Sequence, residues 1–185
     1  MPCDRRGGRS LARTRRDVLC WAPCPPPTHG ALLDIRRDDL SDPRTVALLR
    51  AHRADLARHS PPESVHALDV DVAALRAAPI TFWSVWDGEH LAGCGALKAL
   101  EPGHGEIKSM RTVDAYRRRG VAARLLEHLI AEARGCGCRR LSLETGSGPA
   151  FAPAHALYLR FGFTDCAPFG DYAPDPYSRF LTRAL

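Results

Sequence analysis

The stretch GEIKSMRTVDAYRRRGVAARLLEHLIAEA, residues 105–133, decides the fold of this chain of 185 residues. Its first nine residues predict a strand, and its last thirteen place their apolar side chains in one helical stripe. Three consecutive arginines and Gly120 stand between these two patterns. We therefore expect a strand, a glycine-containing loop and a helix from about Arg118 to Arg134, with Gly135 as its C-terminal stop.

The three arginines stand where the helix dipole disfavours positive charge. An anion bound at the helix start would explain them, because the first N–H groups of a helix have no internal partner and attract negative charge. Gly120 would let the main chain approach a phosphate closely, and the guanidinium groups would add forked donors. The loop thus favours a pyrophosphate site, while a solvated arginine run before a helix is the alternative interpretation.

Strand and helix patterns alternate along the chain from residue 31. Strands are predicted at 31–37, 80–87, 91–100, 139–145, 163–169 and 178–184, and helices at 43–59, 67–78 and 152–161. Asp42 is expected to cap the first helix, and Gly162 to stop the last. The order β-α-α-β-β-β-α-β-α-β-β predicts a single α/β domain, of the α+β kind, with a mixed sheet flanked by helices. The free edges of such a sheet would allow a homodimer.

The net charge of +5 lies mostly in residues 1–30, which carry six arginines against two aspartates. The rest of the chain has a net charge of only +1, which disfavours a broad nucleic-acid-binding face. Residues 1–30 also contain three consecutive prolines and show no sustained period. We expect a disordered, basic and proline-rich extension there, followed by one domain at 31–185. A basic recruitment arm is the alternative interpretation of the extension.

The seven cysteines are scattered and odd in number, which is not typical of a disulfide framework, so we expect small buried thiols. No HExxH motif or paired Cys/His spacing occurs, and we assign no metal. The chain contains no apolar run as long as a membrane span, and its basic N-terminus lacks the apolar stretch of a secretory signal. We therefore expect a cytoplasmic protein that has neither a membrane nor a nucleic acid as its partner.

Four stretches of the sequence carry a resemblance to a known family. The arrangement R-x-x-G-x-A, formed by Arg117, Gly120 and Ala122, resembles the acyl-CoA-binding signature of the GNAT superfamily of N-acetyltransferases. RRLSLETG at 139–146 and HALYLRFGF at 155–163 resemble that superfamily's next strand and helix. The ending FGDYAPDPYSRFLTRAL is similar to that of its bacterial YsnE-like subgroup. The resemblance implies the GNAT fold and direct transfer of an acetyl group from acetyl-CoA to an amine in a ternary complex.

The resemblance also implies which residues hold acetyl-CoA. The main chain of Met110, Arg111 and Thr112 would bond the pantetheine arm, and its N–H groups could stabilise the oxyanion. This strand and the strand at 139–145 would splay apart to admit the arm. The pyrophosphate would lie on Arg117, Arg118, Arg119, Gly120, Val121, Ala122 and Ala123.

Acetyl transfer needs a base for the amine and benefits from an acid for the thiolate leaving group. The resemblance places Tyr158 as the acid, since a phenol is protonated at neutral pH. Glu106 leads as the base, because relatives often carry a carboxylate acting through water at this place. Glu144 is its rival, and His66, His155 and bulk water remain open.

The acceptor site is expected around the segment HSPPESVHALD at 59–69 and the aromatic strand at 80–87. Trp83 and Trp86 point to opposite faces of that strand, so at most one of them faces the pocket. The candidate residues are Ser60, Glu63, Ser64, His66 and Trp83. Alternatively, the two prolines are a linker and Ser64 caps the next helix.

A small-molecule amine, such as an amino acid or a related metabolite, is the expected acceptor. The alternatives are a protein or peptide N-acetyltransferase and a non-catalytic acyl-CoA-binding regulatory module.

Overall fold

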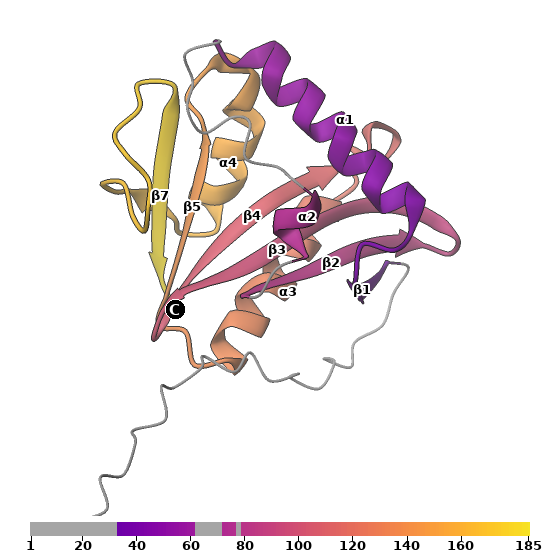
Figure 1. Cartoon of the computed structure of the whole chain (residues 1–185), viewed down its shortest axis with the longest axis horizontal. Helices are drawn as coiled ribbons and strands as arrows, with labels where there is room; N and C mark the ends of the chain where they lie inside the picture. The colour runs from indigo at the N-terminus through magenta and orange to yellow at the C-terminus, as the bar shows by residue number, and fades with distance from the viewer. Residues whose placement is uncertain (1–32, 62–71, 77–78) are drawn as a thin grey trace, which may run out of the picture.

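A seven-stranded sheet forms the centre of the molecule, with strand order β1-β2-β3-β4-β5-β7-β6 (Figure 1). The structure is a computed structural model that describes residues 33–61, 72–76 and 79–185. The strands are β1 (Asp34–Asp38), β2 (Ile80–Asp87), β3 (His90–Glu101), β4 (His104–Thr112), β5 (Arg140–Gly146), β6 (Thr164–Asp165) and β7 (Ser178–Ala184). The helices are α1 (Pro43–His59), α2 (Val72–Leu75), α3 (Val121–Gly135) and α4 (Ala152–Arg160), with short 3-10 turns η1 (Asp114–Tyr116) and η2 (Pro149–Phe151). The predicted element order and mixed α/β class are confirmed.

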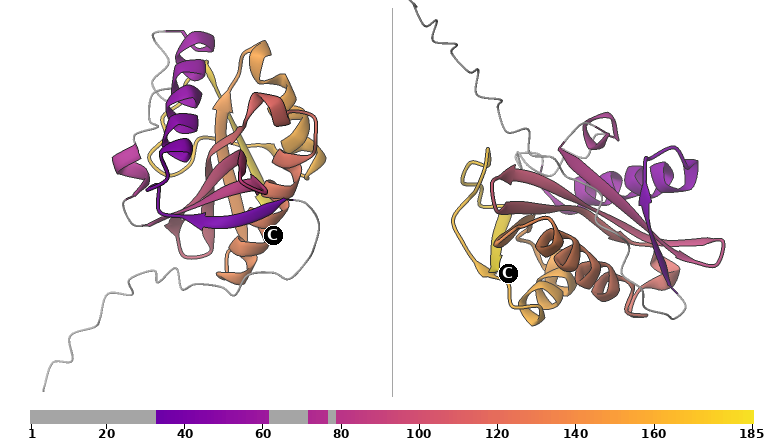
Figure 2. Two further views of the ribbon diagram at one scale, coloured as in Figure 1. Left: turned by 90° about the vertical axis from the view of Figure 1, so that its right-hand side faces the viewer. Right: turned by 90° about the horizontal axis from the view of Figure 1, so that it is seen from below.

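The helices cover both faces of the sheet, α1 and α2 on one face and α3 and α4 on the other (Figure 2). Alternation along β2 separates the two cores, since Trp83 and Val85 join the cluster under α3 while Phe82 packs with Leu49 of α1 and Leu75 of α2. Both sheet edges, β1 and β6, are short strands. A homodimer through one of these edges stays a prediction.

Helix α1 begins and ends where the local sequence predicts. The side chain of Asp42 accepts a hydrogen bond from the N–H of Arg44 at 2.8 Å, and Pro43 occupies the first turn. At the other end, the N–H of Ser60 donates to the carbonyl of Leu56 at 2.9 Å. The N-cap assigned to Asp42 is confirmed.

Strands β4 and β5 run parallel but pair over only part of their length. His104–Ile107 of β4 lies beside Arg140–Leu143 of β5, and beyond this point β4 continues to Thr112 without a partner on that side. Figure 1 shows the two strands diverging toward their carboxyl ends. The predicted separation of these strands is confirmed, and it opens the sheet in its middle.

The bounds of α3 differ from the prediction at both ends. The helix starts at Val121 rather than Arg118, because Arg118 and Gly120 have left-handed φ angles of 59° and 82°. At its end Gly135 is still helical, and the left-handed residue that stops the helix is Gly137, with φ 78°. The N–H of Cys138 then donates to the carbonyl of Ala133 at 2.9 Å, closing the end of the helix.

The strand predicted at 163–169 is also wrong in length, since β6 holds only Thr164 and Asp165. The chain leaves the sheet soon after Cys166, and Pro168 has no N–H to donate to a neighbouring strand. The N–H of Cys166 still bonds the carbonyl of Phe180 at 3.0 Å. The segment that follows is a loop that contacts the first half of β4, and it carries Tyr172.

Some predictions concern residues outside the described ranges. The extension at 1–30 lies there, as does most of the helix predicted at 67–78, of which α2 shows four residues. Within the described part of the chain, no helix is both long enough and apolar enough to cross a membrane.

Candidate active site

A cleft of about 370 Å³ opens where β4 and β5 part. The end of α1 and the helix α4 border it, together with the loop between β6 and β7. Its lining includes Met110, Arg111, Thr112 and Arg117, which are four of the residues predicted to hold the coenzyme. The structure thus brings the predicted pantetheine strand to the wall of a cavity.

The remaining predicted coenzyme residues, 118–123, form the loop and first turn of α3. All six are described, and none of them lines the cleft. The left-handed Arg118 and Gly120 turn the chain into the helix, and the carbonyl of Gly120 accepts the first helical hydrogen bond, from Arg124 at 3.0 Å. The N–H groups of the first turn have no side-chain cap and are left for an external acceptor. Arg117, just before this loop, forms an ion pair with Asp114 at 2.6 Å. A turn of this form with its arginines fits a diphosphate.

Glu106 is fully buried, with 0% of its surface exposed, although it forms part of the wall of the cleft. Its Oε1 accepts hydrogen bonds from Lys108 Nζ at 2.7 Å and from the hydroxyl of Tyr172 at 2.6 Å. Its Oε2 is buried and has no partner. A buried carboxylate is stable only when it is paired, and Lys108 supplies the opposite charge.

Tyr158 lies on α4 and also borders the cleft. Only 7% of the residue is exposed, and its ring packs edge-on against Phe163. Burial, and secondarily the charge of Glu144, raise the pKa of Tyr158 well above its ordinary value. The phenol therefore stays protonated at neutral pH and can donate a proton.

Glu144 borders the same cleft from β5 and is half-buried. The hydroxyl of Ser178 donates to its Oε1 at 2.6 Å. The cleft thus contains both glutamates that the sequence offers as the base, on opposite strands of the gap.

The α1 side of the cleft is charged. Arg111 of β4 forms an ion pair with Asp55 of α1 and a second one with Asp114 at 3.3 Å. Burial, and then the charge of Arg111, lower the pKa of His52 to about 4. His52 is therefore neutral at physiological pH, and it borders the cleft as a hydrogen-bonding group without charge.

The predicted acceptor residues have different outcomes. Ser60 borders the cleft. Trp83 does not: it is 1% exposed in the core under α3, where its ring meets the ring of His128 at 5.6 Å. Its place in β2 points it to the face opposite α1, so assigning it to the acceptor site was wrong. Glu63, Ser64 and His66 lie outside the described residues.

His155, an open candidate for the base, lies on α4 and is not part of the cleft lining. Its Nε2 lies 2.8 Å from the carbonyl oxygen of Gly146 and is therefore engaged by the main chain. His155 thus holds the loop between β5 and α4.

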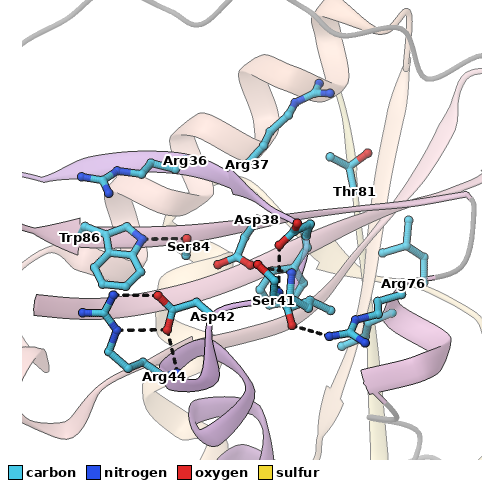
Figure 3. A pocket seen from close by; sticks show the side chains of 15 residues that line it. Arg36, Arg37, Asp38, Ser41, Asp42, Arg44, Arg76, Thr81, Ser84 and Trp86 are labelled. Carbon is cyan, nitrogen blue, oxygen red and sulfur yellow. Dashed lines mark hydrogen bonds and ion pairs between the residues drawn. The ribbon is translucent and has the colours of Figure 1, made fainter. Parts of the chain in front are cut away.

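A larger hollow of about 750 Å³ lies between β1, β2 and the start of α1 (Figure 3). Arg44 pairs with Asp42 at 2.7 Å, and Arg76 donates to the carbonyl of Leu40 at 2.6 Å (Figure 3). Arg36 and Arg37 pair with carboxylates outside the hollow, those of Asp34 and Glu132. The guanidinium of Arg44 also lies 4.3 Å from the ring centre of Trp86. Among the described residues, none of the buried polar atoms without a partner belongs to this hollow. We assign no chemistry to it.

A row of Glu101, His104 and Ser142 at the start of β4 has the order of a catalytic triad, but its hydrogen bonds run in the opposite direction. Arg140 can only donate, and it lies 3.0 Å from His104 Nδ1, so this nitrogen is an acceptor. His104 Nε2 must then donate to Ser142 at 2.8 Å. The hydroxyl of Ser142 then donates its own hydrogen to the hydroxyl of Thr182, at 2.9 Å. The serine is thus not deprotonated by the histidine, and the row is a structural network.

The cysteines of the described chain are free thiols. Cys94 is fully buried, which raises the pKa of its thiol to about 12. In the same part of the chain, no group of three or more His, Cys, Asp or Glu side chains could hold a metal ion. Metal ligation therefore has no candidate among these residues.

Comparison with known proteins decides the family. Residues 32–163 match the acetyltransferase (GNAT) family. The chain belongs to this family. It is 52% identical to YsnE of Bacillus subtilis strain 168 over 153 residues, which are 83% of this chain and 100% of that protein. It is also 52% identical to YedL of Escherichia coli K12 over 154 residues, 83% of this chain and 96% of that protein. Both relatives are named uncharacterized N-acetyltransferases.

The fold agrees with this assignment. The crystal structure of a candidate acyl-CoA N-acyltransferase from Klebsiella pneumoniae matches with a TM-score of 0.66 and 28% identity, covering 84% of this chain and 99% of that one. The predicted GNAT membership and its YsnE-like character are confirmed. The protein is an acyltransferase of the GNAT N-acetyltransferase type, and acetyl-CoA is its co-substrate.

Lys108 and Tyr172 are two of the polar residues at this GNAT site that were not predicted. Lys108 could have been found, because it lies two residues after Glu106 and alternation puts both side chains on one face of the strand. Tyr172 lies in the segment FGDYAPDPYSRFLTRAL, but no local pattern in it indicates a contact with Glu106, which is 66 residues away.

Proposed function

We propose that the protein transfers an acetyl group from acetyl-CoA to the primary amine of a small molecule, such as an amino acid or a related metabolite, by direct attack in a ternary complex. The observation that carries this proposal is the cleft of about 370 Å³, which Tyr158, Glu106 and Glu144 border together beside the pantetheine strand. A cavity of this size suits a small acceptor next to the thioester. Cytoplasmic location and a homodimer belong to the same proposal.

In this proposal the coenzyme enters the gap between β4 and β5 as an additional strand. The main chain of Met110, Arg111 and Thr112 bonds the pantetheine arm, and the first turn of α3 holds the diphosphate. The acetyl group then lies near the N–H groups at the end of β4, which stabilise the oxyanion. The thioester faces the cleft and the phenol of Tyr158.

The reaction needs the amine to lose a proton and the thiolate to gain one. Tyr158 donates to the thiolate, because its raised pKa keeps the phenol protonated. Glu106 is the base that receives the amine's proton, with Glu144 as the alternative. Ser60 at the end of α1 is the described residue that we assign to the acceptor.

The test is an acetyl-CoA assay with the full chain, in which released thiol is measured against a panel of amino acids, small amines and short peptides. We expect turnover with one class of small amine and none with peptides. Turnover confined to peptide N-termini would contradict the small-molecule acceptor. Binding of acetyl-CoA without turnover on any amine would favour a non-catalytic module instead.

A further inference from the structure

The two halves of helix α1 are attached to the molecule in different ways. In the first half, Thr45 and Leu49 are buried, and Leu49 packs with Phe82 in the core under this helix. From Arg50 to His59 no residue is buried, although this half of the helix is the one that borders the cleft. Hydrophobic packing therefore anchors the start of α1 and leaves its cleft end to other contacts.

The second half of α1 presents one face to the cavity. The residues that border the cleft recur three or four positions apart, as expected for one side of a helix: His52, Asp55, Leu56, His59 and Ser60. This face is a wall of the candidate acceptor site, and it includes the serine that we assign to the acceptor. The position of this half of α1 relative to β4 therefore sets the space that an acceptor can occupy.

An ion pair joins this wall to the sheet. The guanidinium of Arg111 on β4 contacts the carboxylate of Asp55 on α1. The two side chains are 15% and 18% exposed, so water screens this pair less than it screens a pair on the open surface. Arg58, one turn further along α1, binds the same carboxylate. Asp55 is thus held between two cations, one from its own helix and one from the sheet.

A bulge in β4 turns Arg111 toward α1. The side chain of Ile107 packs under α3, and simple alternation would turn Arg111 to the same face. Between Lys108 and Arg111, however, β4 has one residue more than its neighbour β3, and Ser109 has a left-handed φ of 54°. The extra residue shifts the alternation by one. Arg111 therefore stands opposite Cys94, whose side chain packs in the core cluster under α1.

The second carboxylate partner of Arg111 belongs to a different part of the molecule. Asp114 lies in η1, just after β4, at 3.3 Å from the guanidinium of Arg111 and 2.6 Å from that of Arg117. Its side chain is 72% exposed, so its pair with Arg111 is more open to water than the pair with Asp55. Asp55 is therefore the partner through which Arg111 acts on α1.

We propose that Arg111 and Asp55 are positioning residues for acetyl transfer, because their ion pair holds the second half of α1 at the distance from β4 at which the acceptor amine meets the thioester. This inference rests on the proposed function. Neither side chain takes part in the bond changes. The pair acts by placing the wall that carries Leu56 and Ser60 against the acceptor, and a small displacement of such a wall lowers activity by a large factor.

The decisive variant is Asp55→Asn, which removes the charge and keeps the shape of the side chain. We expect KM for the acceptor amine to rise about ten-fold, with a smaller change in kcat, because the acceptor wall is no longer fixed. The affinity for coenzyme A, measured by calorimetry, should stay the same. Asp55→Glu keeps the charge and should restore most of the loss. Asp114→Asn is the matched control, since it removes the other carboxylate of Arg111 and should leave KM for the amine unchanged.

A double-mutant cycle tests whether the two residues act through each other. Arg111→Met removes the guanidinium, leaves Asp55 paired with Arg58 and Asp114 paired with Arg117, and should raise KM for the amine as Asp55→Asn does. The double variant should be no worse than the stronger single variant, because the second substitution removes nothing further once the ion pair is lost. Effects that multiply would show that each residue acts separately and would overturn the proposal.

Hydrogen exchange follows the helix without reference to activity. In Asp55→Asn the main-chain amides of residues 52–59 should exchange faster, while those of residues 46–49 keep the wild-type rate because the buried side chains of the first half still anchor it. Arg44→Met, which breaks an ion pair at the opposite end of α1, should not accelerate exchange at 52–59. Thermal unfolding checks that each variant is folded, and Arg111→Met carries the same test if Asp55→Asn does not fold.

The outcomes separate this inference from the proposed function. A wild-type enzyme that acetylates a small amine and keeps its KM in Asp55→Asn would overturn the positioning role alone, as would unchanged exchange at residues 52–59. A folded wild-type protein that binds coenzyme A but acetylates no amine would overturn the proposed function. The role of the ion pair in placing an acceptor would then fall with it, and hydrogen exchange would still decide whether the pair holds α1.

Discussion

At the residue scale, the surroundings of Tyr158 decide its chemistry. Burial in the α4 core and the nearby charge of Glu144 raise its pKa, so the proton that it donates is present across the neutral range. We expect Tyr158→Phe to lower kcat roughly ten-fold or more, with a smaller effect on the KM for acetyl-CoA, because the hydroxyl acts on the leaving group. Steady-state kinetics on the wild type and the variant measure this. Unchanged turnover would remove Tyr158 from the mechanism.

The two glutamates at the cleft also belong to this scale. Glu106 is held by Lys108 and Tyr172, whereas Glu144 accepts a hydrogen bond from Ser178. We expect Glu106→Gln to erase the acidic limb of kcat/KM and Glu144→Gln to retain it, since only the base must lose a proton before the reaction. Steady-state kinetics of the wild type and both variants over a range of pH measure this. The reverse pattern would make Glu144 the base.

At the element scale, α3 has a left-handed glycine at each end. Gly120 and Gly137 have φ angles of 82° and 78°, and a Cβ at either position would meet no atom within 4 Å. Alanine should therefore cost about 1 kcal/mol of folding stability at both, through backbone strain alone. Only Gly120→Ala should also weaken coenzyme A binding, because Gly120 shapes the helix start that we assign to the diphosphate. Thermal unfolding and calorimetry on both variants check this; equal affinities would move the diphosphate site elsewhere.

At the scale of the whole molecule, the matched family region and the cleft both lie after residue 31. Removing residues 1–30 should therefore leave the affinity for acetyl-CoA unchanged, although it removes a net charge of +4. Calorimetry at two salt concentrations measures this and separates long-range attraction from contact. A large loss of affinity at both concentrations would make the N-terminal extension part of the site.

The sequence alone determined most of the elements and the glycine loop before α3, because hydrophobic period, caps and glycine turns act between near neighbours. The N-cap at Asp42, the strand at 80–87 and the loop before α3 are features of this kind. Only the tertiary structure decided which side chains share the cleft. Trp83 faces the core, and Tyr172 reaches Glu106 across 66 residues, because strand order and register set such contacts and neither is a local property.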